Sequence, residues 1–127
     1  MSQSKKPKTS IKRKISEMLS EMAVGFLGVG DSIGERQNRL NAACTAWNMA
    51  CGSPLVRQRQ LDQYRQGYLR FNPGTSRADL ANILKDMELL IERKLKLFPD
   101  DKRQIVEARV VKVGNKFRIE VASATLE

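Results

Sequence analysis

Residues 103–124 read RQIVEARVVKVGNKFRIEVASA, and this stretch decides the fold class. Its two halves are rich in β-branched residues and flank a glycine-asparagine pair at 114–115. A two-residue turn of this kind between two such runs predicts a tight antiparallel β-hairpin. This part of the chain is therefore expected to form strands, whereas the part before it has the spacing of helices.

Centring the hairpin on that turn fixes which residues face one another. The expected pairs are Ala108–Val121, Val110–Ile119 and Lys112–Phe117 on one face, and Arg109–Glu120 and Val111–Arg118 on the other. The first face is mostly apolar and the second is mixed and charged, which is typical of a sheet packed on one side only. A lone hairpin is marginal in water, so we expect it to pack on the helix that directly precedes it. Both outer edges would stay unpaired, and a second copy or a protein partner could add a strand there.

Apolar residues recur at helical spacing through the rest of the chain and predict about four helices. We expect helices over residues 11–27, 34–50 and 54–71, and a fourth from a Ser76 cap to Phe98. The fourth has the clearest stripe, and Ser76 stands three residues before an acidic residue, close to a capping box. The third has a weaker apolar stripe, formed by Leu61, Tyr64, Tyr68 and Leu69.

These elements predict an α+β fold that is mainly helical, with a C-terminal antiparallel β-hairpin packed on the last helix. Residues 15–127 would form one globular domain after a basic, disordered tail over residues 1–14. Trp47 and the cysteines Cys44 and Cys51 lie on the apolar stripe of the second helix, where we expect them in the core. The indole N–H of Trp47 should find a nearby acceptor.

The net charge of +9 is concentrated at the N-terminus. The tail contains six basic residues and no acidic one, namely Lys5, Lys6, Lys8, Lys12, Arg13 and Lys14. Such a segment can neutralise several phosphates without any fold, which adds salt-dependent affinity for nucleic acid. Arginines of the third helix could supplement it, and the candidates are Arg57, Arg59 and Arg65.

The glycine-rich segment GFLGVGDSIGER at 25–36 invites a phosphate-loop interpretation, which the spacing contradicts. A Walker A loop needs a lysine where this chain has Glu35, and a dinucleotide loop needs a glycine one position before Gly34. We therefore interpret the segment as a hinge between two helices, with Asp31 or Ser32 capping the second.

Residues for catalysis are scarce. The chain has no histidine, which is the commonest general acid or base at neutral pH. Cys44 and Cys51 are too far apart to bridge within one helix, and two cysteines without histidine make no zinc site. A weak resemblance to the PD-(D/E)xK nucleases rests on Asp100, Asp101 and Glu107, but Arg109 stands at the lysine position. We expect no enzyme activity, metal or cofactor.

The sequence thus predicts a small non-catalytic binding or accessory protein. Its basic tail would contact nucleic acid, or an acidic protein or ribonucleoprotein partner, while a small-molecule substrate is not expected. No membrane span or signal peptide is apparent, so an intracellular, cytoplasmic location is expected, or a nuclear one in a eukaryote. The alternative is an assembly subunit without nucleic acid, joined through the hairpin edge or through the first helix at Ile15, Met18, Met22 and Phe26.

Overall fold

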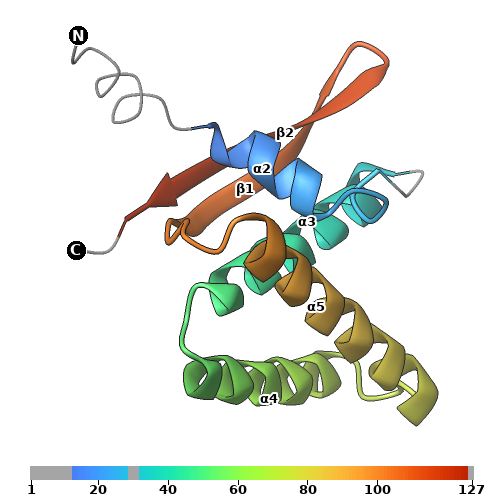
Figure 1. Cartoon of the computed structure of the whole chain (residues 1–127). Coiled ribbons are helices and arrows are strands. Elements are labelled where there is room, and N and C mark those ends of the chain that lie inside the picture. Colours follow the sequence, from blue (N-terminus) through green and yellow to red (C-terminus); the bar gives the residue numbers. More distant parts are fainter. Residues whose placement is uncertain (1–12, 29–31, 126–127) are drawn as a thin grey trace, which may run out of the picture.

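The computed structural model describes residues 13–28 and 32–125 of the chain. Its elements follow the order α2 (Ile15–Met22), α3 (Ile33–Ala50), α4 (Pro54–Phe71), α5 (Arg77–Leu97), β1 (Gln104–Val113) and β2 (Lys116–Ala124). Figure 1 shows the hairpin crossing α2 and α3 at one end of the molecule, with α4 at the opposite end. The predicted class, mainly helical α+β with a C-terminal antiparallel hairpin, is confirmed.

Local signals place the ends of the last three helices. The Ser32 side chain accepts from the backbone N–H of Glu35, whose carboxylate accepts in return from the Ser32 backbone, so the two form a capping box. Ser53 caps α4 ahead of a proline at its first position, and Ser76 caps α5. These helices begin at or within one residue of the expected positions.

The first helix is shorter than predicted. We expected it to continue to residue 27, but α2 ends at Met22 and the chain turns at Gly25. Gly25 has φ 86°, a left-handed conformation that glycine adopts without the steric cost of a side chain. Phe26 and Leu27 still pack against the core, so the apolar spacing continued after the helix had ended.

The centre of the core is α3. Small residues on this helix, Ala43, Ala46 and Ala50, are fully buried and allow close approach of neighbouring elements. Trp47 is also fully buried, and its indole N–H donates to the carbonyl of Arg103 at 2.8 Å, as the sequence predicted. The core is completed by apolar residues of α2, α5 and the hairpin, among them Leu19, Met22, Met87, Leu90, Ile91, Ile105 and Val110.

The hairpin has the predicted register, including the pairs Val110–Ile119 and Arg109–Glu120. Gly114 has φ 63° and no other residue of this turn has a positive φ, which matches a II′ turn with glycine first. One extra residue, Val106, bulges from β1 where the register shifts.

The predicted platform for the hairpin is wrong. β1 packs on α3 and β2 on α2, while neither strand contacts α5. The reason lies in α3, whose side-chain amides at Gln37 and Asn48 hydrogen-bond the β1 backbone while its small residues admit the apolar face. The hydrogen bonds also mean that the outer edge of β1 is paired at Ile105, Ala108 and Val110, contrary to expectation.

The α4 helix is loosely attached. None of its residues is buried, and the expected apolar stripe of Leu61, Tyr64, Tyr68 and Leu69 is only half-buried. Leu55 and Phe71, near the two ends of the helix, are 71% and 82% exposed. This helix therefore presents most of its surface to solvent.

Candidate nucleic-acid interface

One face of α4 carries a row of exposed long polar side chains. Arg59, Gln63, Gln66 and Arg70 are all exposed, and their spacing of four, three and four residues puts them on one side of the helix. Arg65 is exposed on a different side of α4, and the helix contains a single acidic residue, Asp62. Guanidinium and amide groups in such a row are donors suited to phosphate and sugar oxygens.

The arginines of α4 differ from most arginines elsewhere in the molecule. Within residues 13–28 and 32–125, the arginines for which no hydrogen bond, ion pair or ring contact occurs are Arg59, Arg65, Arg70 and Arg77. All four lie on α4 or at the first residue of α5. In contrast, Arg103 pairs with Asp101, and Arg109 and Arg118 share Glu120. The arginines that the fold leaves without a partner are therefore all on α4 or at the start of α5.

Arg57, a predicted site residue, has a different environment. It is half-buried, and its Nη2 donates to the carbonyl of Gly52 at 3.0 Å, across the turn that joins α3 to α4. Its Nε is buried without a partner among the described residues. Arg57 thus helps to hold the start of α4, whereas Arg59 and Arg65 face solvent.

Of the predicted basic tail, Lys5, Lys6, Lys8 and Lys12 lie outside the described residues. Lys14 is exposed at the N-cap of α2. Arg13 forms an ion pair with Glu21 at 2.9 Å, with about half of each side chain exposed. Its charge is therefore partly compensated within α2.

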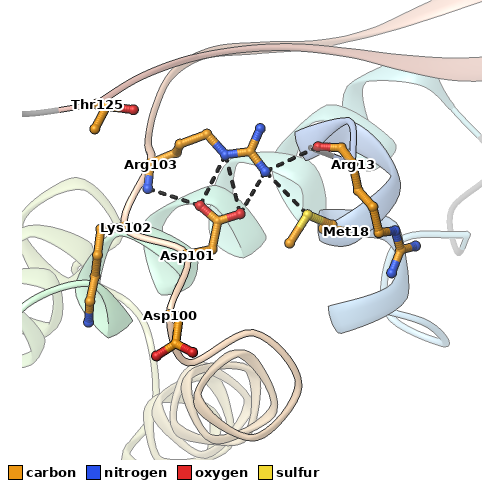
Figure 2. Close-up of a pocket in the computed structure, with 7 residues that line it drawn as sticks. All are labelled: Arg13, Met18, Asp100, Asp101, Lys102, Arg103 and Thr125. Carbon is orange, nitrogen blue, oxygen red and sulfur yellow. Dashed lines mark hydrogen bonds and ion pairs between the residues drawn. The ribbon is translucent and has the colours of Figure 1, made fainter. Parts of the chain in front are cut away.

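A half-buried ion pair between Asp101 and Arg103 lies where Arg13 meets the domain, as Figure 2 shows. Arg103 donates to both carboxylate oxygens of Asp101, at 2.6 Å from Nη2 to Oδ2 and 3.0 Å from Nε to Oδ1. The same Nη2 donates to the carbonyl of Arg13 at 3.2 Å. These residues line a cavity of about 370 Å³ together with Met18 and Thr125. Arg103 thereby ties the start of α2 to the segment between α5 and β1.

The contact with Arg103 changes the pKa of Asp101. Burial disfavours its carboxylate, but the hydrogen bonds and the charge of Arg103 outweigh burial and hold the pKa of Asp101 below its usual value. Lys94, which is fully buried, donates to the Asp101 backbone carbonyl and stands 5.0 Å from the Trp47 ring. Burial lowers the pKa of Lys94. The carboxylate and the ammonium are thus both used to hold the α5–β1 segment in place.

Of the predicted basic tail, only Arg13 and Lys14, beside α2, can be placed relative to α4. α2 makes no contact with α4, and Figure 1 shows them on opposite sides of α3 and α5. Arg59 and Arg65 share the property of having no partner with Arg70 and Arg77, which sequence reasoning missed. The spacing of Arg70 from Arg59, eleven residues or three helical turns, was the available signal for the first of these.

The glycine-rich segment offers no described phosphate cradle. Ser32 and Glu35 satisfy one another in the capping box, so the Glu35 carboxylate occupies the first turn of α3. Ser32 is the expected cap, while residues 29–31, including Asp31, lie outside the described part of the chain.

The cysteines are thiols within the fold. Cys44 is buried, and burial raises its pKa to about 12, so it holds no appreciable thiolate at neutral pH. Cys51 is half-buried, and burial raises its pKa as well. Among the described residues, no group of three or more histidine, cysteine or acidic side chains is placed to hold a metal ion. Asp101, part of the weak nuclease motif, is committed to Arg103.

No helix in the described ranges has both the length and the apolar character to cross a bilayer. Comparisons of the chain with protein-family models, with curated proteins and with solved structures found no match.

Proposed function

We propose that this protein is a non-catalytic nucleic-acid-binding protein that attaches through the exposed arginines of α4 and through its basic N-terminal residues. The observation that carries the proposal is the set of arginines on α4 and at the start of α5 that have no partner within the described structure. Elsewhere the fold uses most of its arginines for caps, ion pairs or ring contacts.

Electrostatics favours phosphate as the ligand of this surface. Each arginine or lysine that neutralises a phosphate releases a counterion, so affinity falls steeply as salt rises. Arg59 and Arg70 stand at the two ends of the row and Gln63 and Gln66 between them, so charged and neutral donors would follow a backbone along α4. Lys5, Lys6, Lys8 and Lys12 would add a second, unspecific contact with phosphates.

The test compares two sets of substitutions in the full chain by titrating labelled single- and double-stranded oligonucleotides at several salt concentrations. The first set changes Arg59, Arg65 and Arg70 to Gln. The control changes Arg109, Lys116 and Arg118 to Gln, which removes the same charge from the hairpin. If the three α4 arginines contact phosphates, the log–log salt slope should become shallower by about 2 on a single strand and about 3 on a duplex.

The control should shift the slope by less than the α4 set, because Arg109 and Arg118 are already paired with Glu120. Equal loss in both sets would mean that only net charge matters, and an unchanged slope in the α4 set would refute the assigned interface. A further variant with Lys5, Lys6, Lys8 and Lys12 changed to Gln measures the contribution of the tail.

A second candidate function is assembly through β2. Among the described residues, nothing hydrogen-bonds the outer edge of β2, whereas Gln37 and Asn48 occupy that of β1. Assembly through the apolar residues of the first helix is not supported, because Ile15, Met18 and Met22 are buried in the core of the same chain. A concentration-dependent increase in mass that Ile119→Pro abolishes, with the helical circular-dichroism signal retained, would favour pairing through β2.

A further inference from the structure

Three helices enclose a cavity of about 310 Å³ behind α4. One side each of α3, α4 and α5 lines it, together with Phe26 from the turn after α2. The lining residues that carry polar or aromatic groups are Asn38 and Arg39 on α3, Tyr64 and Tyr68 on α4, and Asp86 on α5. The cavity exists because α4 touches the core through only part of one face. It opens beside the arginine-bearing helix of the proposed interface.

The walls of this cavity are rich in aromatic rings. The rings of Tyr64 and Tyr68 lie 6.4 Å apart at an angle of 37°. The guanidinium of Arg39 lies over the Phe26 ring at 4.8 Å, so a flat cationic group adjoins a flat apolar one. Such surfaces accept a planar ring by stacking.

Polar groups of the cavity remain unused. Within the described ranges, the side chains of Asp86 and Asn38 have no hydrogen-bond or ion-pair partner. Arg39 uses Nη1 to donate to the Phe26 carbonyl at 3.2 Å, and its guanidinium makes no other hydrogen bond to a described residue. A carboxylate, an amide and a guanidinium thus line one aromatic cavity, which is the composition of a site that orients a planar polar ligand.

We propose that this cavity receives one unpaired nucleobase of a bound single strand, and that the base carries an amino group. Stacking on the aromatic side chains would hold the ring, and the Asp86 carboxylate would accept a hydrogen bond from the amino group, as acidic side chains do from cytosine N4. Uracil has a carbonyl at that position, which faces the carboxylate unfavourably. This inference rests on the proposed function and names the strand and base that the protein prefers.

The position of Arg65 supports this arrangement. It follows Tyr64 directly and precedes Tyr68 by three residues, so it stands near the rim of the cavity on the same helix. A phosphate held by Arg65 would place the attached base next to the tyrosines. The charge contact and the base contact are therefore provided by adjacent residues of α4.

The experiment compares oligocytidylate with oligouridylate of equal length. Cytosine carries an amino group at ring carbon C4, where uracil carries a carbonyl. At high salt, where the phosphate contribution is suppressed, the wild-type chain should bind oligocytidylate about fivefold or more tightly. Asp86→Asn should abolish that preference, because an amide can accept from the amino group of cytosine and donate to the carbonyl of uracil alike. The matched control, Glu88→Gln, removes the same charge from an exposed position of α5 outside the cavity and should keep the preference.

The outcomes separate the two proposals. Salt-dependent binding without a preference for oligocytidylate, or a preference that survives Asp86→Asn, would refute the base site and leave the proposed function standing. Failure to bind either strand, or any duplex, at low salt would overturn both. Asp86 and Glu88 are exposed, so both variants should retain wild-type thermal unfolding, which circular dichroism checks.

Discussion

Asn48 and Ile105 are joined by two hydrogen bonds, one in each direction. The Asn48 Nδ2 donates to the Ile105 carbonyl at 2.9 Å, and the Ile105 N–H donates to Asn48 Oδ1 at 2.7 Å. A side-chain amide on α3 thus pairs with β1 as the backbone of a neighbouring strand would. Gln37, three turns earlier on α3, does the same with the carbonyl of Ala108 and the N–H of Val110.

Asn48→Ala should lower the free energy of unfolding by about 2 kcal/mol, because it leaves a part-buried donor and acceptor of β1 without partners. Equilibrium urea unfolding, followed by the fluorescence of Trp47, measures the change. The control is Gln58→Ala on the exposed side of α4, which should stay within about 0.5 kcal/mol of wild type. Equal stability of Asn48→Ala and wild type would show that the amide contributes nothing to hairpin docking.

Asp101→Asn should destabilise the protein at neutral pH by about 1–2 kcal/mol, because it weakens charged hydrogen bonds from Arg103. The pKa of Asp101 is lowered in the folded state, so its contribution is complete above the usual aspartate pKa of 3.8. It is lost as the pH falls below 3.8 and through the lower, folded-state pKa. The stability difference between wild type and variant should therefore close in that acidic window, measured by urea unfolding across pH. A difference that is constant with pH would contradict the ion pair.

Substitution by alanine should change the stability of the protein in opposite directions at two of its glycines. Gly67 lies in the interior of α4 with nothing within 4 Å of an added Cβ, so Gly67→Ala should stabilise the protein by about 0.5–1 kcal/mol. Gly114 has open space too, but its φ of 63° is strained for any other residue. Gly114→Ala should cost about 1 kcal/mol. Thermal unfolding of the two variants measures both changes in stability. If Gly114→Ala stabilised the protein as Gly67→Ala does, the turn conformation would be contradicted.

The two cysteines should differ in reactivity in the folded protein. The pKa of Cys44, about 12, leaves almost no thiolate near neutral pH, so iodoacetamide should reach it only after unfolding. Cys51 is less buried and should be alkylated first. Mass spectrometry of a time course measures the order, and labelling in urea, where both should react alike, provides the control. Faster labelling of Cys44 would contradict its placement in the core.

Sequence reasoning succeeded where the deciding signals are local. The bounds of α4 follow from Pro54 and the turn after Phe71, and the hairpin register follows from the residues at 114–115. It failed where the packing of an element depends on contacts between residues that are far apart in the sequence. The choice of α3 over α5 as the platform depends on amides at Gln37 and Asn48, whose partners lie more than fifty residues away.

The residues of the candidate site also fall into two groups, those that the sequence predicts and those that only the fold brings together. Arg59 and Arg65 were found from composition, because a run of arginine and glutamine on one helix is visible in the sequence. Asp86, Asn38 and Arg39 were not, because only the packing of three helices brings them to one cavity with the tyrosines.

The amides of α3 also limit how copies of this protein could join. A hairpin with two free edges can add a strand on each side and so grow without end. Here Gln37 and Asn48 occupy the N–H groups of Ile105 and Val110 and the carbonyls of Ile105 and Ala108, which obstructs strand addition along β1, whereas no hydrogen bond within the described residues occupies the outer edge of β2. Pairing of β2 with β2 would consume that edge in both molecules, so association by this route would stop at two chains.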